Sequence, residues 1–306
     1  MIRPVLRVLR PALLVSALAV ALAACGAPQT APTATPSTAN IPAEYQARPD
    51  GDITIPAVSP AYLNDHNRRQ WVDYNGPERA GTIVVDPYAR YLYHVVEPGR
   101  AMRFGVAVGK AGKGFKGSAT VRRKEQYPSW TPTKNMVRND PDLYGPLAGG
   151  LKGGLDNPLG ARALYLYRGG RDTMYRIHGT MDPSSIGRAT SAGCIRLFNQ
   201  DIIDLYDEMD LGTPVKVRTL SESLELEGEM VELHTGYLVP ATDTAAIAAD
   251  QAAWEAGQIV DPAVAEAQSH AAAVAAAEAT AAGKTPVPYD PTKSAEEREA
   301  LLIGAN

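Results

Sequence analysis

The sequence predicts a mostly β domain of the α+β class, with one or two helices packed on it, over residues 79–218. Short runs of β-branched and aromatic residues alternate there with Pro, Gly and Asp, which is typical of strands joined by tight turns. Helical periodicity is convincing in one central segment that follows Asn199. The composition changes sharply on both sides of this stretch, and roughly 140 residues is an ordinary size for one domain.

Residues 1–24 have the features of an export signal. Three arginines precede a short apolar run over residues 11–22, which is too short for a permanent span of about 20 apolar residues. The run ends in Leu22-Ala23-Ala24-Cys25, which resembles the bacterial lipobox, where the signal is cut before a cysteine that carries lipid. We therefore expect a periplasmic protein anchored to the membrane through Cys25; an ordinary small-residue cleavage site is the alternative. Gly26 replaces the aspartate of inner-membrane lipoproteins and favours the outer membrane.

Residues 25–56 are rich in Pro, Thr, Ala and Ser and show little hydrophobic periodicity. Such a segment buries too little apolar surface to offset its ordering entropy, so it is expected to be a flexible tether. Residues 57–78 contain Trp71 and Tyr74 and are expected to form an N-terminal extension docked on the domain.

The domain is predicted to open with an antiparallel meander of three strands, at 82–86, 91–96 and 102–108, because turn residues separate the three runs. One helix is predicted over 199–209, with Asn199 as its N-cap. Later strands are predicted at 163–167, 173–177 and 214–218.

Residues 219–306 are predicted to form an acidic, Ala-rich tail that is largely disordered or partly helical. They carry fifteen acids against three bases, and twenty of the forty-two residues from 241 to 282 are alanine. The formal charge of the whole chain is −4, whereas residues 25–218 hold 24 bases and 19 acids. A mildly basic domain suits an anionic polymer, but the excess is too small to indicate nucleic acid.

The chain has two cysteines, and with Cys25 assigned to the export signal, Cys194 remains as a lone thiol. It follows His178 by sixteen positions and lies in a Gly-rich loop, where an inert packing cysteine is a poor explanation. A thiolate is the competent nucleophile, and His178, at the end of a predicted strand, is the candidate base. Backbone N–H groups at Gly193 and Cys194 are suited to hold a developing oxyanion.

Three spaced segments carry a family resemblance: Ile177-His178-Gly179-Thr180, Ser185-Ile186-Gly187, and residues 191–197, which read Ser-Ala-Gly-Cys-Ile-Arg-Leu. Together with Asp201 they resemble the catalytic motif of the L,D-transpeptidase (YkuD-type) family. Trp130-Thr131-Pro132 and residues 157–164 resemble the family's substrate-cleft and pre-motif regions. The resemblance covers about 79–218 and implies a β-sandwich-like catalytic domain.

The resemblance also implies a mechanism on peptidoglycan stem peptides. Cys194 would attack the carbonyl of the third residue, a diaminopimelate, and expel the terminal D-alanine, with His178 moving the proton and the Gly179 carbonyl orienting the imidazole. Arg196 has two open interpretations, contact with the donor's carboxylates or a structural salt bridge. The implied catalytic residues are Cys194, His178, Gly179 and Gly193, and the implied substrate-binding residues are Arg196, Ser191 and Trp130.

Three acceptors remain open: a second stem, which gives a 3→3 cross-link, an envelope protein, or water, which makes the protein an L,D-carboxypeptidase. A non-catalytic peptidoglycan-binding lipoprotein is the alternative from another class. No cofactor is expected, and the scattered histidines predict no metal site. Residues 109–114 lack the spacing of a phosphate-binding loop and are expected to form a hairpin turn.

Overall fold

The fold is described from a computed structural model that covers residues 41–109, 115–139, 141–190 and 194–259, and six single residues between 262 and 275. The predicted signal and the first part of the predicted tether lie outside this range, as does the predicted turn from Lys110 to Gly114.

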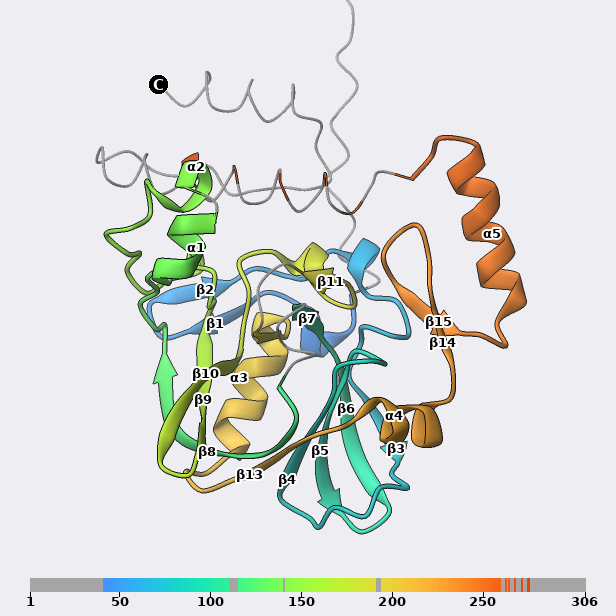
Figure 1. The fold of residues 1–306 in the computed structure, drawn as a ribbon, viewed down its shortest axis with the longest axis horizontal. Coiled ribbons are helices and arrows are strands. Elements are labelled where there is room, and N and C mark those ends of the chain that lie inside the picture. The colour runs from blue at the N-terminus through green and yellow to red at the C-terminus, as the bar shows by residue number, and fades with distance from the viewer. Residues whose placement is uncertain are drawn as a thin grey trace, which may run out of the picture. The chain divides into compact units, whose positions relative to one another are not determined.

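Most of the described strands belong to one mixed sheet (Figure 1). Neighbouring strands are antiparallel except for three parallel pairs, β13 with β4, β10 with β12, and β11 with β7. The order across the sheet is β11 (Ala189–Thr190), β7 (Ala107–Gly109), β12 (Ile195–Arg196), β10 (Arg171–His178), β9 (Arg162–Arg168), β8 (Gly117–Gln126), β13 (Pro214–Val217), β4 (Thr82–Asp86), β5 (Tyr91–Glu97), β6 (Arg100–Gly105) and β3 (Gln70–Asp73).

The sheet curls until its two ends approach each other. Strands β6 and β7 lie near opposite ends of the strand order, yet only Val106 separates them in the chain. A single residue spans less than 4 Å, so the two ends must be close in space. All the main strands from β4 to β13 contribute to one apolar core, which includes Leu92, Leu164 and Ile177. The predicted mostly β fold with packed helices is confirmed.

Helix α3 (Asn199–Glu208) packs into this core through Ile202 and Leu205. Its carboxyl end is held by Lys124 of β8, whose Nζ donates to the carbonyl of Tyr206 at 2.6 Å. The predicted N-cap is wrong: Phe198 occupies the cap position, and Asn199 is the first helical residue. Its side chain is engaged elsewhere, at the end of β10, because it bonds backbone groups of Ala161 and Thr180.

The predicted meander is present as β4, β5 and β6, with one difference. The third strand was predicted to run from 102 to 108, but it breaks at Val106, whose N–H donates to the carbonyl of Arg90 at 3.0 Å. Strand β8 was not predicted, because its sequence, GSATVRRKEQ, is polar and turns only Ala119 and Val121 toward the core.

The predicted tether is wrong for its last part, residues 41–56, which pack on the domain. They form a short 3₁₀ helix, Ala43–Tyr45, and the hairpin β1 (Arg48–Asp50) and β2 (Ile53–Ile55). Asp50 accepts a hydrogen bond at 2.7 Å from buried Arg162 at the start of β9. The side chain of Tyr45 is fully buried, so this segment does bury apolar surface despite its composition. In the extension that follows, a second 3₁₀ helix spans Pro60–Tyr62, and β3 pairs with β6.

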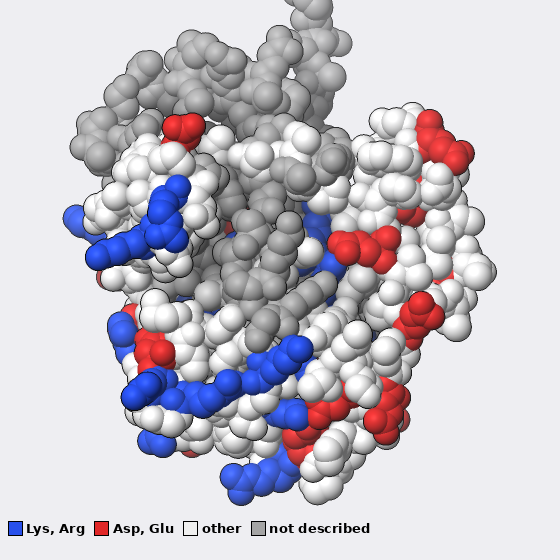
Figure 2. Space-filling view, in the orientation of Figure 1, with Lys and Arg blue, Asp and Glu red and all other residues white. Residues whose placement is uncertain are grey.

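The acidic segment after residue 218 is folded through Glu255. It forms α4 (Leu220–Glu227), the hairpin β14 (Met230–Glu232) and β15 (Leu238–Pro240), and α5 (Thr244–Glu255). Figure 2 shows its acidic side chains gathered on one side of the view. The expected helical content is present in α4 and α5, whereas the hairpin was not predicted.

Arg90 attaches this hairpin to the central sheet. Its guanidinium is 1% exposed, donates to the carbonyl of Gly236 at 2.6 Å, and lies 2.8 Å from Glu232. It also donates to the carbonyl of Gly187 at 3.1 Å, in the loop that leads toward Cys194. One buried cation therefore joins the hairpin to that loop.

Two short helices, α1 (Lys134–Asn139) and α2 (Pro141–Tyr144), occupy the excursion between β8 and β9. A third 3₁₀ helix spans Pro183–Ser185 between β10 and β11. None of the helices within the described residues has the length and apolar character needed to cross a membrane.

Candidate active site

The register of β10 and β12 brings the candidate base and nucleophile near each other. Ile177 pairs with Ile195, and both side chains are buried in the core. Side chains alternate along a strand, so His178, next to Ile177 on β10, points to the opposite face. Cys194 lies one residue before β12, and the backbone of Arg176 on β10 donates a hydrogen bond to its sulfur. The thiol predicted from sequence therefore lies beside the strand that carries the predicted histidine.

The imidazole of His178 is buried, and one of its nitrogens has a fixed role. Nδ1 lies 2.6 Å from the carbonyl oxygen of Gly179. A carbonyl only accepts, so Nδ1 carries the proton and Nε2 is left unprotonated, in the form that a base requires. Burial, and after it the positive charge of Arg196, lower the pKa of His178 to about 3. The resting imidazole is therefore neutral.

The Cys194 residue is half-buried and its thiol is free. Burial raises the pKa of the thiol, while a backbone hydrogen bond from Arg176 and the charges of Arg176 and Arg196 act in the opposite direction. A neutral thiol beside a neutral imidazole is not a preformed ion pair. Such a pair is suited to general-base activation, in which the proton moves to the histidine as the sulfur attacks.

Asn199 fixes the strand end that carries the histidine, a role that sequence reasoning missed. Its Oδ1 accepts from the N–H groups of Ala161 at 3.0 Å and Thr180 at 3.2 Å, and its Nδ2 donates to the Thr180 carbonyl at 2.7 Å. A Cβ at Gly179 would collide with this Oδ1, and so would one at Gly160, where φ is +61°. Glycine is thus needed at both positions for the Asn199 amide to fit. Its bond to the Thr180 N–H holds the peptide unit that also contains the Gly179 carbonyl.

Asp201 belongs to the motif but lies away from the reacting groups. It is fully buried beside the N-terminal segment, where the hydroxyl of Tyr45 donates to it at 3.2 Å and Arg69 lies at 3.7 Å. Burial raises the pKa of Asp201 to about 7 despite the charge of Arg69. This arrangement indicates a structural role under α3.

Two predicted substrate-binding residues have different surroundings. Arg196 ends β12 and influences both His178 and Cys194 through its charge, and no carboxylate of the described residues lies within ion-pair distance of it. Trp130 is half-buried and forms a bridge with Leu151, and its ring centroid lies 6.3 Å from that of Tyr144. No contact within the described ranges joins Trp130 to the histidine or the thiol. Ser191, Gly193 and Cys25 lie outside the described residues.

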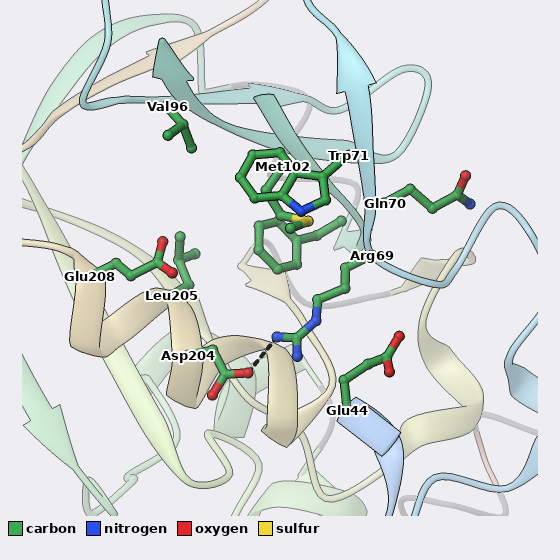
Figure 3. A pocket seen from close by; sticks show the side chains of 10 residues that line it. Glu44, Arg69, Gln70, Trp71, Val96, Met102, Asp204, Leu205 and Glu208 are labelled. Carbon is green, nitrogen blue, oxygen red and sulfur yellow. Dashed lines mark hydrogen bonds and ion pairs between the residues drawn. The ribbon is translucent and has the colours of Figure 1, made fainter. Parts of the chain in front are cut away.

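A separate cavity of about 440 Å³ lies between the β3–β6 edge and α3. Figure 3 shows Trp71 and Met102 on its sheet side and Leu205 and Glu208 on its helix side. Neither His178 nor Cys194 lines it, so it is distinct from the candidate active site. No group of three His, Cys, Asp or Glu side chains in the described part of the chain is arranged to hold a metal ion.

The chain is similar in sequence to known proteins. The family model of the YkuD L,D-transpeptidase catalytic domain matches residues 80–217. A protein of Fuscovulum blasticum, named "Putative L,D-transpeptidase in ATP synthase subunits region ORF 5", is 34% identical over 166 residues, which cover 53% of this chain and 82% of the relative. The chain belongs to the YkuD L,D-transpeptidase family.

A longer relative and one solved structure also match part of this chain. The "Probable L,D-transpeptidase ErfK/SrfK" of Escherichia coli is 36% identical over 141 residues, which cover 45% of this chain and 44% of the relative. The chain thus spans less than half of that protein. A solved protein of Brucella melitensis, described as a probable carnitine operon oxidoreductase, is 47% identical and covers 50% of this chain and 96% of its own, with a TM-score of 0.36. That score is too low for the superposition to support an argument.

Proposed function

We propose that this protein acts as an L,D-transpeptidase on the tetrapeptide stems of peptidoglycan, through a thioester at Cys194. The observation that carries the proposal is the tethering of His178 Nδ1 to the Gly179 carbonyl at 2.6 Å, at the end of the strand that lies beside the free thiol. Membership of the family supports the substrate class.

Acylation would begin with attack of the Cys194 sulfur on the carbonyl of the third, diaminopimelate residue. Nε2 of His178 takes the thiol proton as the carbon–sulfur bond forms. Collapse of the tetrahedral intermediate breaks the amide bond, and the same proton passes to the nitrogen of the departing D-alanine. The donor is left as a thioester, and the imidazole returns to its neutral form.

Deacylation repeats these steps with an acceptor. An amine attacks the thioester, His178 removes the amine proton, and the thiolate leaves and is reprotonated. A second stem as acceptor gives a 3→3 cross-link, and an envelope protein becomes attached to the wall. With water as acceptor the protein is an L,D-carboxypeptidase. The position of Arg196 beside both reacting groups, free of carboxylates among the described residues, supports a role in holding the donor.

The proposed place of action is the periplasm, with the chain anchored through lipid on Cys25 and the outer membrane favoured. The proposal rests on the sequence of residues 1–26. Mass spectrometry of the mature protein tests it: the signal should be absent, and the new N-terminal cysteine should carry acyl chains. In a Cys25→Ser variant the unprocessed chain should accumulate.

The activity is tested with the chain that begins at residue 27 and with its Cys194→Ala variant. Each is incubated with purified disaccharide-tetrapeptide, and the products are followed by mass spectrometry. Circular dichroism and thermal unfolding provide the structural control, because the Cys194→Ala variant should have the same spectrum and unfolding midpoint as the parent chain.

Loss of D-alanine with formation of a dimer joined between third residues, absent in Cys194→Ala, supports the transpeptidase. Loss of D-alanine without a dimer indicates hydrolysis or a missing protein acceptor. An intact stem in the presence of folded protein refutes catalysis. Calorimetric binding of that stem by the parent chain and by Cys194→Ala would then indicate a binding module.

A further inference from the structure

Four adjacent strands bring a row of residues to the face that carries the candidate nucleophile. Arg123 of β8 pairs with Tyr165 of β9, and Tyr165 pairs with Arg176 of β10. The next strand, β12, pairs Ile195 with Ile177, so Cys194 stands beside Arg176. Read across the sheet, the row is Arg123, Tyr165, Arg176 and Cys194. The row therefore ends at the residue that carries the thiol.

The two arginines of this row stack on one aromatic ring. The guanidinium carbons of Arg123 and Arg176 lie 4.2 and 4.3 Å from the centroid of the Tyr165 ring. They come from the strands on either side of β9, so the ring carries one guanidinium from each neighbour. Tyr165 is 5% exposed beneath them. Stacking of this kind holds a planar cation in a defined place near the surface.

Each arginine is also oriented by one acid. The Asp172 carboxylate accepts from Nη1 and Nη2 of Arg176 at 2.8 and 2.9 Å. Glu125 accepts from Nε of Arg123 at 2.8 Å and from the Tyr165 hydroxyl at 2.7 Å. These bonds fix the direction of both guanidinium groups.

The row keeps donors available for a ligand. A guanidinium has five N–H groups. Glu125 engages Nε and Nη2 of Arg123, and the Nη1 group of this half-exposed side chain has no partner among the described residues. Figure 2 shows Lys and Arg side chains gathered where β8 and β9 lie. The surroundings therefore favour an anion.

We propose that Arg123 and Arg176, stacked on Tyr165, form a subsite that binds the free carboxylate of diaminopimelate in the donor stem. This inference rests on the proposed function. Diaminopimelate has two carboxyl groups, and the attacked carbonyl is derived from one of them, so the other remains free at the far end of the side chain. Planar guanidinium groups are suited to bind such a carboxylate.

The reach of the substrate agrees with this placement. Neighbouring strands are about 4.8 Å apart, and the Tyr165 ring under both guanidinium groups belongs to β9, two strand spacings from β12, so these groups lie roughly 10 Å from Cys194. Four carbon–carbon bonds separate the two backbone-like carbons of diaminopimelate, which gives ~5 Å in extended form, and the free carboxylate lies beyond the second carbon. With its first carbonyl at the sulfur, the donor can place its second carboxylate over the row.

Two donors test the subsite: a tetrapeptide with diaminopimelate at the third position and one with lysine, which is the same side chain without the free carboxylate. The rate of D-alanine release, as kcat/KM, is measured for both with the full mature chain. The variants are Arg123→Gln and, as matched control, Arg122→Gln. The control removes the same charge from the neighbouring exposed position, which has no ring contact within the described residues.

The subsite predicts that the unmodified chain prefers the diaminopimelate donor by about tenfold or more. Arg123→Gln should reduce this preference to about twofold, mainly through KM, with little change for the lysine donor, whereas Arg122→Gln should keep it. Equal use of both donors by the unmodified chain overturns the subsite alone, as does an unchanged preference in Arg123→Gln. Release of D-alanine from neither donor overturns the proposed function, and the subsite with it.

Discussion

Replacing Asn199 with alanine should weaken both the fold and the active site, because one amide serves three backbone groups. The change removes the acceptor for the Ala161 and Thr180 N–H groups and the donor to the Thr180 carbonyl. A hydrogen bond contributes about 0.5–1.5 kcal/mol net, so the loss of three should lower the free energy of unfolding by about 2–4 kcal/mol. The carbonyl of Gly179 also loses its support, so the His178 tether should loosen.

Urea unfolding followed by circular dichroism measures the first effect, and D-alanine release at a temperature where the variant is folded measures the second. Asn135→Ala is the matched control, because Asn135 is exposed on α1 and bonds Arg138 of its own helix. It should change the free energy of unfolding by less than about 0.5 kcal/mol. If Asn199→Ala loses less than about 1 kcal/mol and keeps full activity, the support assigned to this amide is wrong.

Two further predictions concern pH. The rate of Cys194 alkylation by iodoacetamide should show no step between pH 5 and 7, because the pKa of His178 is lowered to about 3. The rate should rise only at and above the ordinary thiol pKa of about 8.5, because burial raises the pKa of Cys194. A step near pH 6.5 would contradict a neutral histidine. The pKa of Asp201 is about 7 in the folded chain and about 3.9 in the unfolded chain, so the folded chain binds the proton more tightly. The contribution of Asp201 to the free energy of unfolding should therefore fall as pH rises from 4 to 7, by a few kcal/mol at most. Asp201→Asn should flatten this dependence in urea unfolding at pH 5 and pH 8, and an unchanged slope would contradict the assignment.

The strands with an apolar face were predictable from sequence, whereas the strand that carries the arginine row was not. The β4 and β5 runs are rich in β-branched and aromatic residues, and all of β4 and the first five residues of β5 are buried, which produces a clear apolar run in the sequence. Strand β8 has an open face made of Arg123 and Glu125, so its sequence resembles a solvated loop. One of the two residues that conceal the strand, Arg123, is proposed to bind the donor.

The candidate base and nucleophile, His178 and Cys194, could be named from sequence because they lie in closely spaced motif segments. The hydrogen bonds of Asn199 that support the histidine could not. An asparagine at a helix start has the same signature whether it caps the helix or bonds a neighbouring strand. The choice at Asn199 depends on Gly160 and Gly179, which come close only in the folded chain. Likewise, no local pattern shows that Tyr45 belongs under α3, because its partner Asp201 is 156 positions away.

The contacts of the buried Arg90 guanidinium show that the part of the chain that packs together is larger than the part that the family model matches. The family match ends at residue 217, yet Arg90 lies within it and takes its carboxylate from Glu232 and a carbonyl from Gly236, beyond that limit. A fragment trimmed to the match would leave the Arg90 guanidinium without its carboxylate partner and without one of its two carbonyl acceptors. It would also lose Asp50, which neutralises Arg162 from the other side of the match. Expression of the catalytic region as an independent domain should therefore span residues 41–259.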